Sequence, residues 1–161
     1  LFTMEELQKR LAAQMRLAFF DKLSEDLENE DPQAVDWIAK LHLEMVQRIA
    51  ALRPGRKDEI MDKMDTGIFG RKIKARAFRG EDMQQMVSFT YDVLREIVAA
   101  DMDDKLNASQ AEVVAKMTEP DPKFSVIVPA FLRTVHDLMD ETIARIENMR
   151  EKGLLGSHGD A

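Results

Sequence analysis

The sequence contains no cysteine and has few aromatic residues. The absence of cysteine in its 161 residues excludes disulfide frameworks, thiolate zinc sites and cysteine nucleophiles. Aromatic residues make up only 6% of the chain, whereas methionine occurs 11 times. Methionine is a flexible core filler that strand-rich proteins seldom need in such number, so this balance favours a helical fold.

Long hydrophobic runs and a positive net charge are also missing. The longest apolar run, Val126 to Leu132, contains Pro129 and is far shorter than the roughly 20 residues that cross a bilayer, so we expect no membrane span. The net charge of −7 argues against docking on nucleic acid, because neutralising phosphates needs an excess of lysine and arginine. Any basic site must therefore be local.

The first residue bears on localisation. The chain begins with Leu1 and not with methionine, as expected of a fragment of a larger protein or of a processed organellar protein. In the second case its targeting segment has been removed. The default expectation is a cytoplasmic protein.

What the sequence does contain is helical periodicity bounded by capping residues. Thr3 and Glu6 form a capping box, and the apolar spacing after it predicts a helix to about Glu28. Asp31 followed by proline begins a second helix, which Pro54-Gly55 ends and which we expect to lie antiparallel to the first.

The middle of the chain, residues 56–79, is less regular. A short helix around Ile60 and Met64 is followed by a break near Thr66-Gly67 and by a basic helical stretch that we expect to end at Gly80. A clear 3.6-residue stripe then predicts a helix from Gly80 to Met102.

Three further signals shape the C-terminal third. Ser109 with Glu112 predicts the capping box of a short helix, and Pro120 and Pro122 predict a rigid turn after it. The last helix should span about residues 123–152. Pro129 should kink it unless the helix begins close to that proline.

These elements predict an all-α fold. With no strand-length alternation, internal repeat or linker, residues 1–152 should form one five- to six-helix bundle, mostly antiparallel, with a long C-terminal helix. Residues 153–161 should form a flexible tail. The expected core residues, at the centres of the strongest stripes, are Phe19, Trp37, Leu41, Met45, Tyr91, Leu94, Phe131, Leu138 and Met139.

Catalytic and metal-binding patterns are not recognisable. The histidines His42, His136 and His158 do not lie in arrangements that place metal ligands on one helix face, and we expect His136 to form a hydrogen-bonded pair with Asp140. A calcium loop beginning at Asp101 fails because lysine and leucine occupy positions that need a ligand and a glycine. We therefore predict no metal, no cofactor and no enzymatic activity.

One segment, residues 69–79, differs from the rest of this acidic chain. It has five basic residues, no acidic ones and three apolar residues at positions one, five and ten, a spacing that resembles calmodulin targets and equally fits an anionic surface. The alternative is that the apolar residues belong to the core and the basic ones are merely solvated. The candidate partner-binding residues are Phe69, Arg71, Lys72, Ile73, Lys74, Arg76, Phe78 and Arg79.

Several short elements resemble, in order and spacing, the T-complex protein 11 family. The elements are Ala18-Phe19-Phe20-Asp21, Asp36-Trp37-Ile38, Leu43-Glu44-Met45, Arg53-Pro54-Gly55-Arg56, residues 60–65, residues 89–95 and Leu138-Met139-Asp140. Phe20 stands where the family pattern has tryptophan. The likeness covers most of this chain but only the N-terminal part of a full family member.

The resemblance implies an all-helical regulatory domain without catalytic residues, linked to cAMP-dependent kinase signalling. Together with the absence of catalytic patterns, it favours a protein-interaction domain that binds an acidic protein partner, of which calmodulin is one type. The alternative is a structural subunit of a large assembly, which should expose a large apolar patch and self-associate when isolated. Sequence alone leaves the oligomeric state open.

Overall fold

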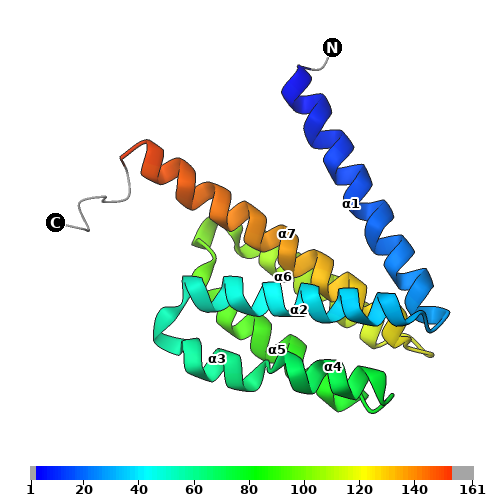
Figure 1. The fold of residues 1–161 in the computed structure, drawn as a ribbon. Helices are drawn as coiled ribbons and strands as arrows, with labels where there is room; N and C mark the ends of the chain where they lie inside the picture. Colours follow the sequence, from blue (N-terminus) through cyan, green and yellow to red (C-terminus); the bar gives the residue numbers. More distant parts are fainter. Residues whose placement is uncertain (1–2, 154–161) are drawn as a thin grey trace.

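The computed structural model describes residues 3–153, and the regular secondary structure in this part of the chain is all helical, with no strand (Figure 1). It has five longer helices and two short ones, and the all-α class and the long C-terminal helix are confirmed. The elements are α1 (Met4–Glu28), α2 (Pro32–Leu52), the 3-10 turn η1 (Pro54–Arg56), α3 (Lys57–Lys63), α4 (Thr66–Lys74), α5 (Gly80–Ile97), the 3-10 turn η2 (Ala100–Met102), α6 (Asp103–Met117) and α7 (Phe124–Glu151). Apart from Gly153, the predicted tail at 153–161 lies outside the described residues.

The starts of the first two helices follow the predicted capping. The Glu6 amide donates to Thr3 Oγ1 at 3.1 Å, and the Thr3 amide donates back to Glu6 Oε2 at 3.2 Å. At α2 the Gln33 amide donates to Asp31 Oδ1 at 2.9 Å, and proline fills the first helical position. Each cap satisfies amides that have no partner within the helix, so the sequence fixes both helix starts.

Three other boundaries differ from the prediction. Helix α5 ends at Ile97 and not at Met102, which belongs to the separate turn η2. Helix α4 ends at Lys74 and not near Gly80, because Arg76 adopts a left-handed φ of 56° and the Ala77 amide turns back to the Lys72 carbonyl at 2.7 Å. Helix α6 begins at Asp103, six residues before the predicted cap, so Ser109 is inside the helix. Its hydroxyl lies 2.5 Å from the Tyr91 hydroxyl on α5 instead.

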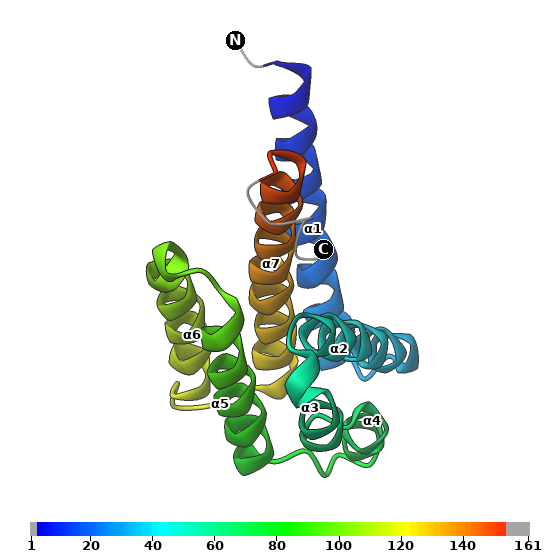
Figure 2. The ribbon, with the colours of Figure 1, turned by 90° about the vertical axis from the view of Figure 1, so that its left-hand side faces the viewer.

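The long helix α7 is the centre of the bundle. It lies between α6 on one side and α1 and α2 on the other, while α5 packs on α6 and α3 and α4 lie against α2 (Figure 2). Contacts pair the end of α1 with the start of α7, and Arg16 with Asp140, so these two helices run antiparallel. Helices α1 and α2 meet near their connection and then diverge (Figure 1), so the expected antiparallel packing of this pair is wrong for most of α1.

The core contains most of the residues predicted for it. Met45, Tyr91, Leu94, Phe131 and Met139 are fully enclosed, Leu138 is 5% exposed, and Leu41 packs against the core from its edge. Phe19 and Trp37 are corrections, because they are 38% and 47% exposed. Their rings meet edge to face at 5.6 Å outside the core, where α1 and α2 begin to diverge.

Pro129 explains how α1 is attached to α7. Proline has no amide hydrogen, so the carbonyl of Ser125 four residues earlier loses its helical partner. The Ser24 hydroxyl of α1 donates to that carbonyl at 2.6 Å, and the Ser125 hydroxyl donates to Glu28 Oε2 at 2.5 Å. Pro129 therefore lies inside α7, five residues after the helix begins at Phe124. The carbonyl that it leaves free is used for a polar contact between α1 and α7.

Truncating a core side chain tests the packing. Leu94→Ala should lower the free energy of unfolding by about 2–5 kcal/mol, because Leu94 is fully buried and the shorter side chain leaves a cavity. Leu43→Ala is the matched control, since Leu43 on α2 is 39% exposed and should cost about 0.5 kcal/mol or less. Urea unfolding measures both, and equal losses would contradict the assigned core.

A double-mutant cycle tests the role of Pro129. Ser24→Ala should cost about 1–3 kcal/mol, because it leaves the carbonyl of the buried Ser125 unpaired. In a Pro129→Ala background the new amide can bond to that carbonyl, so Ser24→Ala should cost about 1 kcal/mol less there. Urea unfolding of the four proteins gives the coupling, and a coupling of zero would show that the proline and Ser24 act independently.

Candidate functional site

The predicted basic segment, residues 69–79, turns its apolar side chains inward. Phe69 and Ile73 on α4 are 4% and 7% exposed, and Phe78 is partly buried against the core. The Phe69 ring stacks on the His42 ring at 4.1 Å and meets the Phe78 ring edge to face at 5.2 Å. Of the two alternatives for these apolar residues, the structure has the one that places them in the core.

The basic side chains of this segment meet carboxylates of the same chain. Lys72 Nζ lies 2.8 Å from Asp82, Lys74 Nζ lies 3.7 Å from Asp36, and an Arg76 guanidinium nitrogen lies 2.5 Å from Glu30. Such surface pairs add little stability, but they reduce the local positive charge. Within residues 3–153, Arg71 and Arg79 are exposed and form no ion pair, so they carry the remaining charge of the segment.

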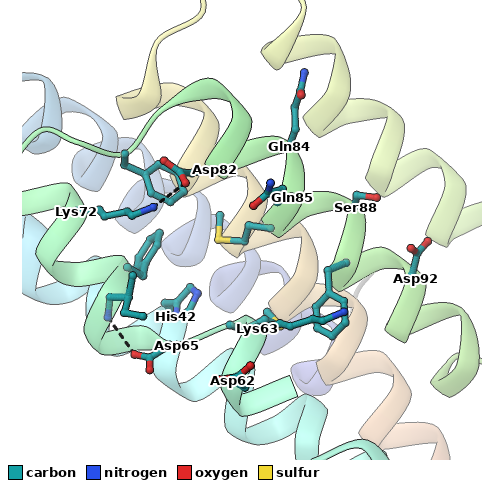
Figure 3. Close-up of a pocket in the computed structure, with 16 residues that line it drawn as sticks. His42, Asp62, Lys63, Asp65, Lys72, Asp82, Gln84, Gln85, Ser88 and Asp92 are labelled. Atoms are coloured by element: carbon teal, nitrogen blue, oxygen red, sulfur yellow. Dashed lines mark hydrogen bonds and ion pairs between the residues drawn. The ribbon is translucent and has the colours of Figure 1, made fainter. Parts of the chain in front are cut away.

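A cavity of about 750 Å³ opens beside the same segment, between α2, α3, α4 and α5 (Figure 3). Phe69, Lys72 and Phe78 of the predicted site line it, together with the buried His42; we call it the His42 cavity. Its charged lining is mixed, with two lysines and four aspartates. These residues are Lys63, Lys72, Asp62, Asp65, Asp82 and Asp92.

Within residues 3–153, His42 is the histidine that lines this cavity, and helical periodicity alone does not predict its burial. Its side chain is 1% exposed, and Nδ1 lies 2.7 Å from the Thr66 hydroxyl at the start of α4. Burial lowers the pKa of the imidazole to about 4, against a smaller opposing effect of Asp65. The ring is therefore neutral at neutral pH and is fixed between Thr66 and Phe69.

The second buried histidine, His136 on α7, belongs to a polar network between α1, α2 and α7. Arg48 donates to His136 Nδ1 at 3.0 Å and to Asp140 Oδ1 at 2.5 Å, and Arg16 donates to Asp140 Oδ2 at 2.5 Å. His136 Nε2 lies 3.0 Å from the Leu41 carbonyl, which completes both ring nitrogens. Arg48 thus joins His136 to Asp140, where a direct pair was expected.

Neither a cluster of metal ligands nor a membrane-spanning helix occurs in the described part of the chain. In residues 3–153 no group of three or more histidine, aspartate or glutamate side chains is placed to hold a metal ion. No helix in the same range is long and apolar enough to cross a bilayer. The absence of a cofactor and of catalysis stays a prediction.

The most exposed apolar surface lies on α1, whose N-terminal half extends beyond the other helices (Figure 1, Figure 2). Met4 and Met15 are 71% and 72% exposed, and Leu7 and Leu11 are 42% and 50% exposed. Spacings of three and four residues place them on one face of the helix, which Phe19 and Trp37 extend toward α2. We call these residues the α1 docking face: Met4, Leu7, Leu11, Met15, Phe19 and Trp37.

This face is distinct from the face by which α1 packs on the bundle. The buried residues of α1 are Phe20, Leu23 and Leu27. At about 100° per residue, Leu23 points about 120° away from Leu11 around the helix axis. The docking face is therefore not a continuation of the buried face. It meets the core at Phe19, whose ring contacts the Phe20 ring at 5.3 Å, whereas Met4, Leu7, Leu11 and Met15 are 42–72% exposed.

Comparisons with protein families, with curated proteins and with solved structures find no match to this chain. The resemblance to the T-complex protein 11 family stays a prediction.

The buried imidazole predicts a pH dependence of stability. Because the folded pKa of His42 lies below its ordinary value of 6.5, the unfolded chain binds the proton more tightly, and stability falls as the pH drops from 6.5 toward 4. His42 alone should lower the free energy of unfolding by about 2 kcal/mol between pH 8 and pH 5.

The variant His42→Gln isolates this contribution. Carboxylates titrate in both proteins, so the difference between their urea unfolding curves over this pH range reports the imidazole. The variant should be less stable at pH 8 yet lose less stability on acidification. Parallel pH profiles for the two proteins would contradict the assigned burial.

Proposed function

We propose that this chain is a non-catalytic helical protein-interaction domain that binds its partner through the α1 docking face. The observation that carries the proposal is the exposure of four large apolar residues, Met4, Leu7, Leu11 and Met15, on a helix that projects from the bundle. Contiguous exposed apolar surface is costly in water and marks interaction sites in soluble proteins.

The shape and charge of α1 indicate a protein partner. A projecting amphipathic helix fits an apolar groove or another helix, which its side chains enter at helical spacing. Charges of both signs flank the face, and Glu5 and Lys9 form an ion pair at 3.6 Å. A helix that binds anionic lipid would carry mainly lysine and arginine on its polar face.

The basic segment 69–79 supports a second, weaker contact for an acidic partner. Its apolar residues are buried, so only the exposed charges of Arg71 and Arg79 remain to attract a carboxylate-rich surface. Exposed charges of this kind steer association and are screened by salt. We therefore expect an acidic partner to gain only a salt-sensitive part of its affinity from this segment.

The environment of His42 supports a non-catalytic role. Thr66 and Phe69 hold the ring in place, and the low pKa leaves it a weak base at neutral pH.

A regulatory role in cAMP-dependent kinase signalling rests on the family resemblance alone. The alternative function, a structural subunit of a large assembly, is supported by the same exposed face, and sedimentation of the isolated chain distinguishes the two because a subunit should self-associate.

Partner capture from cell lysate with matched variants tests the docking face. Leu7→Gln, Leu11→Gln and Met15→Gln together should lower the recovery of specific partners at least tenfold, because the apolar contact is lost. These residues lie outside the core, so the melting temperature should change little.

The control carries Leu43→Gln, Met61→Gln and Met149→Gln, three apolar residues 38–40% exposed on other helices. It should recover the same partners as the native chain. Equal recovery by all three proteins would disprove the docking face, and loss in the control as well would show that capture depends on general surface hydrophobicity.

A further inference from the structure

A second cavity, of about 490 Å³, lies between the start of α5, the end of α6 and the start of α7. Eight apolar side chains of residues 3–153 line it: Phe78, Met83, Val87, Val114, Met117, Pro122, Phe124 and Ile127. Its volume falls within the range of about 300–1,000 Å³ that is typical of small-molecule sites. We call it the α5–α6 groove.

The groove has few polar side chains, and its charged lining is positive. Gln84, Ser88, Gln110 and Thr118 contribute neutral groups, and Arg79 contributes the one charge. Among residues 3–153 no carboxylate lines the groove, although the chain has 30 acidic residues and the His42 cavity is lined by four aspartates. The groove therefore combines apolar walls with a cationic end in an otherwise acidic protein.

Arg79 lines the groove at the start of α5, where its side chain is exposed. Its amide donates to Asp82 Oδ2 at 2.9 Å, which fixes the backbone at the start of α5. The Asp82 carboxylate also accepts Lys72 at 2.8 Å, so its closest cation is a lysine on the side of the His42 cavity. Within residues 3–153 the Arg79 guanidinium forms no ion pair, and its donors suit the two oxygens of a carboxylate.

We propose that the α5–α6 groove binds an amphiphilic carboxylate, with its hydrocarbon chain on Met83, Val87 and Ile127 and its carboxylate on Arg79. Burying the chain removes apolar surface of both molecules from water, and the bidentate contact fixes the orientation of the ligand. The site lies on α5, α6 and α7, so it does not depend on the α1 docking face.

Titration calorimetry of the full chain with decanoate, below its micelle concentration, tests the proposal. Methyl decanoate, which has the same hydrocarbon chain but no charge, is the comparison ligand. Decanoate should bind at one site, and the ester more weakly because it has no charge. Arg79→Gln should weaken decanoate binding about tenfold to a hundredfold and leave the affinity for the ester unchanged.

Two further variants locate the binding. Val114→Trp should block both ligands, because Val114 is 40% exposed on the groove wall and tolerates a larger side chain there. Arg71→Gln, an exposed arginine outside the groove, is the matched control and should bind both ligands as the native chain does. Circular dichroism and melting temperature verify that each variant is folded.

Three results would count against the proposal. Absence of decanoate binding to the native chain would overturn the proposal and leave the groove to a protein side chain. Equal weakening by Arg71→Gln and Arg79→Gln would show a general charge effect. Binding that survives Val114→Trp would place the ligand elsewhere.

Discussion

The arrangement of the molecule depends on a single carbonyl on α7 that proline leaves without a helical partner. Pro129 leaves the Ser125 carbonyl without a helical donor, and the Ser24 hydroxyl of α1 donates a hydrogen bond to that carbonyl. The Ser125 hydroxyl reaches Glu28 beside it, so two hydrogen bonds attach the end of α1 to the start of α7. A buried polar group has to be satisfied, and this requirement fixes where α1 crosses α7 better than apolar contacts alone could.

That attachment determines which part of α1 is left exposed. Four-residue spacing advances the apolar stripe by about 40° at each step, so the residues from Leu7 to Leu27 wind around the helix and do not share one face. The second half of the stripe, at Phe20, Leu23 and Leu27, is buried on the bundle. The first half points elsewhere and, once the helix is attached at Ser24, projects as the α1 docking face.

Sequence patterns predicted a helix correctly where the residues that cap it and form its apolar stripe lie close together in the chain. The capping box at Thr3, the Asp31-Pro32 start of α2 and the stripe of α5 predict their helices because the hydrogen bonds and apolar spacing involve neighbouring residues. The same kind of signal was wrong at Ser109, whose hydroxyl bonds to Tyr91 on another helix. It also could not show that Phe69 and Ile73 turn inward, since three apolar residues in a basic helix fit the core and a partner equally well.

The sequence by itself determined the helical class, most helix boundaries, the chemistry of the core and the positions of the charges, because these follow from periodicity and from local hydrogen bonding. Tertiary structure alone decided which face of α1 is covered, that His42 is buried, and that Lys72, Lys74 and Arg76 meet carboxylates. It also brought Arg79 beside the apolar side chains of the α5–α6 groove. Each of these depends on contacts between residues distant in the chain, and helical periodicity defines a face without specifying what covers it.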